Sequence, residues 1–262
     1  MLLIPTLNIV GAGPGDPELI TLKGLKALQQ AAVILYDALA PKALLKYACP
    51  HCKLVFVGKR KGKKEFSQEE INQLIVFYAT RFGPVVRLKG GDPNVFGRGH
   101  EELEYCIKRG VEVNVIPGVS SAIAAPSAAG IPLTKRGVNE SFWVTTGTLS
   151  SGELANDIHL AAQSSATIVI LMGMSNLKQI VSVFEQARSA FEPIAVIQNA
   201  TTPEQKIVTG TMSDIEQLIL ENGISSPAVI VIGRVVNERI VLEESIPVEI
   251  ERIQNSGLKN KS

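Results

Sequence analysis

The stretch VVRLKGGDPNVFGRGHEE, which runs from Val85 to Glu102, decides the fold of this chain. It starts with an apolar run, which is typical of a strand buried on both faces of a parallel sheet. Two adjacent glycines then let the backbone bend and approach a ligand closely, and Pro93 prevents the strand from continuing. A helix is predicted from about Gly99 to Arg109. Because ligands of open α/β sheets bind beyond the carboxyl ends of the strands, the stretch predicts half of a small-molecule site, with an aspartate and Arg98 in it.

Strand-like and helix-like segments alternate on both sides of this stretch, which is the pattern of a parallel α/β fold. The first half predicts strands at Leu7–Val10, Val33–Tyr36, Lys53–Val57, Pro84–Lys89 and Val111–Ile116, and helices near residues 22–28, 67–81 and 120–129. The second half predicts strands at Phe142–Thr146, Thr167–Leu171, Ile194–Ile197, Lys206–Thr209 and Val229–Ile232, and helices at Leu177–Arg188 and Ser213–Glu221. Two of the helices begin with capping-box spacing, at Ser67 with Glu70 and at Ser213 with Glu216.

The segment from Gly130 to Gly137 interrupts this alternation with glycines, a proline and charged residues, which indicates a domain boundary. We therefore expect an N-terminal α/β domain at residues 1–133, a linker at 134–137 and a second α/β domain at 138–245. The polar residues 246–262 are expected to form a loose tail.

Composition narrows the possible functions. The chain has 262 residues, 45% hydrophobic and 19% charged, with a net charge of +1, so it is neither disordered nor strongly attracted to nucleic acid or an acidic membrane. Its apolar runs fall short of the roughly 20 residues that span a bilayer, and the first residues lack the basic region of a signal peptide. Three cysteines favour a reducing, cytoplasmic setting.

Two short motifs have alternative interpretations. Gly11, Gly13 and Gly15 after the first strand, with Asp37 after the second, approximate a dinucleotide-binding fingerprint. The third glycine comes one residue early, and Asp16 would oppose a pyrophosphate, so nicotinamide or flavin binding is disfavoured. The basic run KRKGKK at residues 59–64 is interpreted either as a solvated loop or as a contact for a substrate rich in carboxylates.

Cys49 and Cys52 form a C-x-x-C motif, which is a possible redox pair or half of a zinc site. A thioredoxin-type pair opens a helix, whereas this one follows a helical stretch and precedes a strand. No second pair of ligands has the matching spacing, so a turn that merely contains cysteines is favoured and no metal is expected.

Taken together, several motifs resemble those of the uroporphyrinogen-III C-methyltransferases across residues 7–236. They are GAGPGD at 11–16, YD at 36–37, VGKR at 57–60, RLKGGDP at 87–93, FGRG at 96–99, GIPLT at 130–134 and MG at 172–173. The resemblance implies the tetrapyrrole methyltransferase (class III) fold, in which two α/β domains hold S-adenosyl-L-methionine in the cleft between them, usually in a homodimer. It also implies methylation of two pyrrole carbons of uroporphyrinogen III to precorrin-2, for sirohaem and cobalamin, with S-adenosyl-L-homocysteine as the by-product.

The resemblance also assigns roles to individual residues. The implied cofactor contacts are Pro14, Gly90, Gly91, Asp92, Val95, Ser120, Ser121, Met172 and Ala200. Asp37 matches the family's proposed proton acceptor, Lys59 its proposed proton donor, and Arg98 and Glu101 positions implicated in substrate handling. These roles suit the chemistry, because an activated methyl group needs alignment more than a strong base, and a base is needed afterwards, when the methylated ring loses a proton.

Six residues depart from the family's usual pattern, and they are Ala38, Asn94, His100, Ala128, Lys135 and Thr148. We expect several of them to lie near the mouth of the substrate site, where they would affect contacts with carboxylates. Two alternative functions therefore stay open. One is a related precorrin methyltransferase that acts on another ring carbon, and the other is a module that binds S-adenosylmethionine without catalysis.

Overall fold

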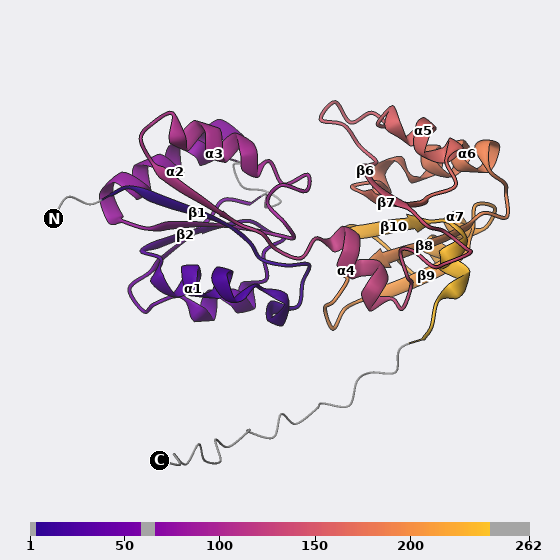
Figure 1. Ribbon diagram of the computed structural model, residues 1–262, viewed down its shortest axis with the longest axis horizontal. Helices are drawn as coiled ribbons and strands as arrows, with labels where there is room; N and C mark the ends of the chain where they lie inside the picture. Colours follow the sequence, from indigo (N-terminus) through magenta and orange to yellow (C-terminus); the bar gives the residue numbers. More distant parts are fainter. Residues whose placement is uncertain (1–3, 59–65, 242–262) are drawn as a thin grey trace, which may run out of the picture.

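The first domain contains a five-stranded parallel sheet, shown at the left of Figure 1. The computed structural model describes residues 4–58 and 66–241. The strand order is β3-β2-β4-β1-β5, which places β4 and β1 at the centre. The strands are β1 (Thr6–Gly11), β2 (Val33–Tyr36), β3 (Lys53–Phe56), β4 (Val85–Lys89) and β5 (Glu112–Ile116).

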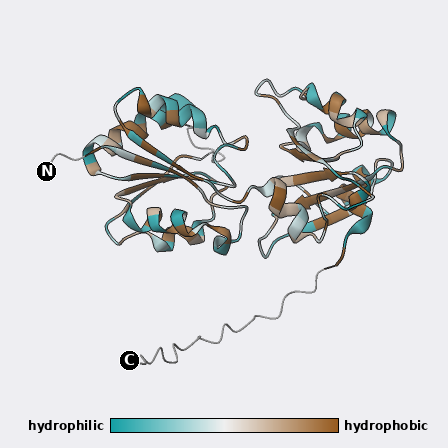
Figure 2. Ribbon diagram, in the orientation of Figure 1, coloured by the Kyte–Doolittle hydropathy of each residue, from teal (hydrophilic) through white to brown (hydrophobic). Residues whose placement is uncertain are grey.

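Helices cover both faces of this sheet, because alternate side chains of each strand point to opposite faces. Ile9 and Leu35 pack beneath α2 (Gln68–Phe82) and α3 (Gly99–Ile107), whereas Val10 and Leu88 pack against α1 (Leu22–Gln30) and the 3-10 helix η2 (Lys42–Tyr47). Figure 2 shows the hydrophobic strands between helices with hydrophilic outer faces. The capping box predicted at the start of α2 is confirmed, since Ser67 and Glu70 each bond the other's backbone N–H.

The second domain is built on a mixed sheet in the order β6-β7-β10-β8-β9. Only β6 and β7 pair in parallel, while β10 runs antiparallel to both of its neighbours and β9 antiparallel to β8. The strands are β6 (Phe142–Thr146), β7 (Thr167–Leu171), β8 (Pro193–Gln198), β9 (Lys206–Thr211) and β10 (Ala228–Ile232). One face is covered by α5 (Asp157–Gln163), α6 (Leu177–Ala187) and α7 (Ile215–Glu221).

The opposite face of the second sheet is covered by α4 (Ser121–Ala128), a helix of small residues. Ala122 and Ala125 pack against Val169 and Val231 of the second sheet. Helix α4 packs on β7 and β10, and in Figure 1 it is joined to the first sheet by a single connection. Because a helix belongs to the core that it buries, we propose a domain boundary between β5 and α4, near residues 117–120 and ahead of the expected linker at 134–137.

Some second-domain expectations need correction. The predicted capping box at Ser213 is wrong, because α7 begins at Ile215 and Ser213 instead hydrogen-bonds the hydroxyl of Thr211. Helix α5 has only seven residues, and the sequence pattern gave no sign of it.

Three sequence expectations fall outside the described residues. They concern Lys59 as a proton donor, the rest of the basic run up to Lys64, and the polar tail at 246–262. The short 3-10 helices are η1 (Pro17–Leu19), η3 (Met174–Asn176) and η4 (Arg234–Glu238). Across residues 4–58 and 66–241, no helix combines the length and the apolar character that crossing a bilayer requires.

Candidate functional site

Three glycines pack against one another where β1, β4 and β5 end. A Cβ on Gly11 would lie 2.5 Å from the nitrogen of Gly118, and a Cβ on Gly118 would lie 2.4 Å from the carbonyl oxygen of Gly91. Gly91 also exchanges two backbone hydrogen bonds with Gly13, of 2.7 and 3.3 Å. The sequence GAGPG therefore serves backbone packing at the carboxyl edge of the sheet.

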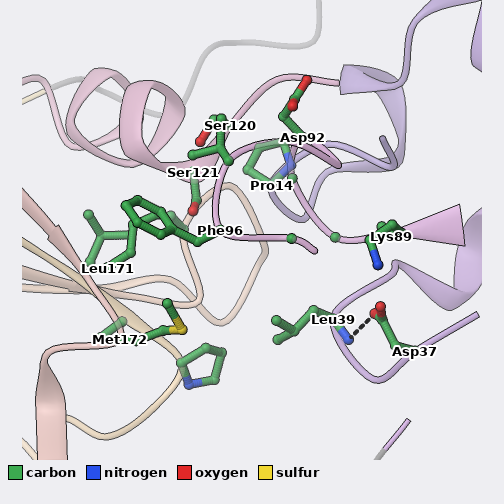
Figure 3. A pocket seen from close by; sticks show the side chains of 18 of the residues that line it. Pro14, Asp37, Leu39, Lys89, Asp92, Phe96, Ser120, Ser121, Leu171 and Met172 are labelled. Atoms are coloured by element: carbon green, nitrogen blue, oxygen red, sulfur yellow. Dashed lines mark hydrogen bonds between the residues drawn. The ribbon is translucent and has the colours of Figure 1, made fainter. Parts of the chain in front are cut away.

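A cavity of about 540 Å³ opens at this edge, between the two domains (Figure 3). Its volume is typical of a site for a small molecule or cofactor. The loop after β4 forms one wall, and residues from β7, β8 and β10 with their loops form the opposite wall. Residues 90–92, directly after β4, are called the glycine loop, and the lining residues outside it include Pro14, Leu39, Phe96, Ser120, Ser121, Leu171, Met172, Ile197, Ala200 and Val229.

The cavity brings together most of the residues that the resemblance assigns. All the implied cofactor contacts lie on its wall, and so do Asp37 and Arg98. Glu101 is not on the wall, but it accepts two hydrogen bonds from Arg98, of 2.7 and 2.8 Å. The structure therefore places these residues around one cavity, and their individual roles stay predictions.

Asp92 fastens the glycine loop. Its Oδ1 accepts a hydrogen bond of 2.8 Å from the backbone N–H of Asn94, and its Oδ2 accepts one of 3.0 Å from the backbone N–H of Gly118. Figure 3 shows this carboxylate directed away from Lys89 and Asp37. Asp92 therefore joins the loop after β4 to the turn between β5 and α4, and it shapes the cavity by holding these two segments together.

Asp37 is held at the charged end of the cavity. Its Oδ1 accepts hydrogen bonds from the backbone N–H groups of Leu39 and Ala40, at 3.1 and 3.2 Å. Its Oδ2 lies 3.2 Å from Nη2 of Arg87, and its side chain is still 25% exposed. The carboxylate is thus fixed in direction and open to the cavity, as a residue that exchanges a proton with a bound molecule must be.

A buried cluster of charges supports Asp37, and sequence reasoning missed it. Glu102 is fully buried, and its Oε1 accepts hydrogen bonds from Arg87 Nε at 3.1 Å, Lys89 Nζ at 3.0 Å and Gln68 Nε2 at 3.2 Å. Burial and the neighbouring Arg87 guanidinium lower the pKa of Lys89, whereas the contact with Glu102 opposes this change. The signal in the sequence was the pair of cations Arg87 and Lys89 in an otherwise apolar strand.

Backbone strain gathers around the cavity. Within the described residues, five non-glycine residues have φ between 48° and 66°, and all but Thr201 line the cavity: Phe96, Arg98, Met172 and Asn199. Left-handed backbone is unfavourable for Phe96, Arg98 and Met172, though common for asparagine, and such strain clusters at functional sites. Thr148 supports one of these residues, since its hydroxyl donates a hydrogen bond of 2.6 Å to the carbonyl of Met172.

The cavity has two chemically different ends. The second domain contributes Met172, Ile197, Ala200 and Val229, which are suited to an apolar or aromatic group. The first domain contributes Asp37, Arg87, Lys89 and Arg98, which are suited to a polar, charged molecule. Such a site can hold two different reactants and align them across the glycine loop.

The departures from the family pattern lie off the described cavity wall. None of Ala38, Asn94, His100, Ala128, Lys135 or Thr148 is among the residues that line it. His100 pairs with Glu104 on the exposed face of α3, and Lys135 pairs with Glu238. Thr148 reaches the wall through its hydrogen bond to the carbonyl of Met172, and the expectation that several of these residues lie near the mouth stays a prediction.

The cysteines are predicted to be dispensable. All three are free thiols, and burial, reinforced by the nearby Cys49, raises the pKa of Cys52 to about 11, which keeps this thiol protonated near neutral pH. Among the described residues, no group of three or more His, Cys, Asp or Glu side chains could hold a metal ion. We expect the double variant Cys49→Ser, Cys52→Ser to keep the activity of the unmodified protein within about twofold. A loss of activity accompanied by loss of bound zinc would contradict this.

Comparison with known proteins gives consistent results. A model of the family described as the tetrapyrrole (corrin/porphyrin) methylases matches residues 6–216. A uroporphyrinogen-III C-methyltransferase of Methanocaldococcus jannaschii is 49% identical over 231 residues, which is 87% of this chain and 96% of that protein. A uroporphyrin-III C-methyl transferase of Thermus thermophilus, solved in complex with S-adenyl homocysteine, is 37% identical with a TM-score of 0.77, covering 89% of this chain and 99% of that one. A cobalt precorrin-4 methyltransferase structure is 31% identical with a TM-score of 0.79, covering 88% of this chain and 95% of that one.

Proposed function

Because this chain belongs to the tetrapyrrole (corrin/porphyrin) methylases, we propose that it transfers methyl groups from S-adenosyl-L-methionine to two pyrrole carbons of uroporphyrinogen III. The products are precorrin-2 and S-adenosyl-L-homocysteine, and precorrin-2 is a precursor for sirohaem and cobalamin. The observation that carries the proposal is the cavity itself, which joins all the implied cofactor contacts to the fixed carboxylate of Asp37.

The residues present fit the cofactor. Gly91 has φ +65°, which favours glycine, and a Cβ there would meet nothing closer than 3.9 Å, so the space beside the loop is open toward Ser120 and Ser121. Pro14, Ser120 and Ser121 would hold the cofactor from the first-domain side, and Met172 and Ala200 from the second. When bound, the sulfonium supplies an activated methyl group.

Residues of the chain align the two reactants and remove the proton. The glycine loop, fastened by Asp92, fixes the geometry between the two reactants, so that a pyrrole carbon can meet the methyl group in line. Asp37, held by Arg87 and by two backbone amides, accepts the proton that the methylated ring must lose. The side chains of Leu39, Val95 and Phe96 give this wall of the cavity an apolar surface against which the tetrapyrrole ring can pack.

Methylation at another ring carbon is the second candidate, because the precorrin-4 methyltransferase structure has the same fold. Its lower identity, 31% against 49% for the relative from Methanocaldococcus jannaschii, favours the uroporphyrinogen reaction. A module that only binds the cofactor is disfavoured, because it would not need the buried charges that hold Asp37.

The test is an anaerobic incubation of the protein with uroporphyrinogen III and methyl-labelled S-adenosylmethionine. We expect incorporation of two labelled methyl groups per tetrapyrrole, detected by mass spectrometry, and the absorption spectrum of oxidised precorrin-2. Binding of S-adenosylhomocysteine without labelling would support the non-catalytic alternative. Labelling of a later precorrin, with none of uroporphyrinogen III, would support the second candidate.

We also propose that the protein acts as a homodimer in the cytoplasm. The resemblance to the uroporphyrinogen-III C-methyltransferases implies a homodimer, and the three free cysteines favour a reducing compartment. Sedimentation equilibrium of the purified chain tests the dimer, and a single species at the monomer mass of 28.1 kDa would contradict it.

A further inference from the structure

Lys89 is a buried cation on the cavity wall. It is the last residue of β4, and its side chain is only 6% exposed. Removing an ammonium group from water costs several kcal/mol unless other groups replace the lost hydrogen bonds. A methionine or leucine would fill the same place in this strand without that cost, so the fold alone does not call for a lysine here.

Lys89 also makes fewer hydrogen bonds than Arg87, the other cation of β4. Arg87 donates to Glu102, to Asp37 and to the carbonyl of Leu88, so each of its three nitrogens has an acceptor. Lys89 Nζ has three hydrogens, and among the described residues it makes one hydrogen bond, to Glu102 Oε1. Two N–H groups of a buried ammonium are therefore left to a molecule that enters the cavity.

The side chain lies on the side of the cavity where Asp37 lies. Figure 3 shows Lys89 directed toward Asp37 and Leu39 and away from Met172 and Ser121, which belong to the implied cofactor set. An acceptor for its free N–H groups would then come from the tetrapyrrole. Uroporphyrinogen III carries acetate and propionate side chains, and carboxylates are strong acceptors for an ammonium group.

We propose that Lys89 binds one carboxylate of the tetrapyrrole substrate and so sets the position of the ring above the glycine loop. The inference rests on the proposed function, and it adds a residue that governs substrate binding. Lys89 directly precedes Gly90, so a carboxylate held there is placed against the loop that is proposed to position the methyl group. Arg87 and Lys89 share Glu102, and Arg87 also contacts Asp37, so the four charges balance. What the cluster offers to an incoming carboxylate is therefore the two N–H groups of Lys89 that lack an acceptor within the described part of the chain.

The experiment separates substrate binding from turnover. Protein saturated with S-adenosylhomocysteine cannot transfer a methyl group, so calorimetric titration with uroporphyrinogen III under anaerobic conditions reports binding alone. We expect Lys89→Met to weaken this binding by about 10- to 100-fold, which is the usual loss for a buried charged hydrogen bond, and to raise the Michaelis constant for the tetrapyrrole similarly. The affinity for S-adenosylhomocysteine should change less than twofold, and Lys89→Arg should recover part of the tetrapyrrole affinity.

Two further variants separate a binding role from a structural one. Lys108→Met removes an exposed lysine that pairs with Glu104, and it should leave both affinities unchanged. If Lys89→Met alone folds poorly, the double variant Lys89→Met, Glu102→Gln replaces it. This variant removes one cation and one anion, so the net charge of the cluster stays the same. It should bind uroporphyrinogen III at least tenfold more weakly than Glu102→Gln alone.

Three outcomes would overturn the proposal. They are unchanged tetrapyrrole affinity in Lys89→Met, an equal loss of affinity for S-adenosylhomocysteine, and a loss of turnover with normal binding of both ligands. The proposed function is judged separately, by whether the unmodified protein methylates uroporphyrinogen III. Normal methylation with no effect of Lys89→Met would sink this inference alone.

Discussion

Replacing Asp37 with asparagine is expected to lower turnover by about 10²- to 10⁴-fold, the range typical of a lost acid-base group. The asparagine oxygen can still accept hydrogen bonds from Leu39 and Ala40, so the turn after β2 should persist. What disappears is the negative oxygen that faces Arg87 and the cavity. Both ligands should bind nearly as well as before, which equilibrium titrations with S-adenosylhomocysteine and uroporphyrinogen III would measure alongside steady-state rates.

Arg98 and Glu101 provide the competing explanation. They form an exposed pair with two hydrogen bonds, and the bond from Arg98 holds the pKa of Glu101 below its ordinary value. Near-normal turnover in Asp37→Asn, with a collapse in Arg98→Lys or Glu101→Gln, would transfer the proton-accepting role to that pair. If Asp37→Asn instead abolished cofactor binding, its role would be architectural. As a matched control, Asp157→Asn changes an exposed aspartate on α5 and should leave turnover unaltered.

The first sheet could be predicted from sequence because its signals are local. Each buried strand is a short apolar run that ends at glycine or a polar residue, and the resulting edge collects Asp37, Asp92 and Ser120 whatever the strand order. The second sheet has similar apolar strands, yet only β6 and β7 pair in parallel. Strand direction there depends on which partner each strand meets across the sheet, and short apolar runs do not encode that choice.

The position of α4 shows a similar limit. Its alanines and serines carry no clear amphipathic pattern, so the sequence could not tell which sheet it covers. Tertiary packing places α4 on the second sheet, because its small residues let the helix lie close to β7 and β10. The charged cluster was missed for a related reason. Arg87 and Lys89 are conspicuous in their strand, but their anion, Glu102, lies on a helix whose register against the sheet is a tertiary property.

Replacing Asp92 with alanine is expected to weaken the binding of S-adenosylhomocysteine by about 10- to 100-fold, because hydrogen bonds to charged groups contribute about 1.5–3 kcal/mol each and part of that loss falls on the ordered loop. Asp92 follows the two glycines at the end of β4, and its two oxygens hold the backbone N–H groups of Asn94 and Gly118. Without them, the segment that must present Gly90 and Gly91 to the cofactor would no longer be fixed to the start of α4. Calorimetry would measure the affinity, and circular dichroism would check that the fold is intact.

A second aspartate, Asp214, provides a matched control, because it also holds a turn through a hydrogen bond to a backbone N–H but lies away from the cavity. Asp214 Oδ1 accepts a hydrogen bond of 2.6 Å from the backbone N–H of Thr211, beside α7 and off the described cavity wall. Asp214→Ala should therefore lower the melting temperature while the affinity for S-adenosylhomocysteine stays within twofold. Equal losses of affinity in both variants would mean that any weakened turn disturbs the cavity. Unchanged affinity in Asp92→Ala would remove the glycine loop from the cofactor site, and with it the geometric basis for aligning the two reactants.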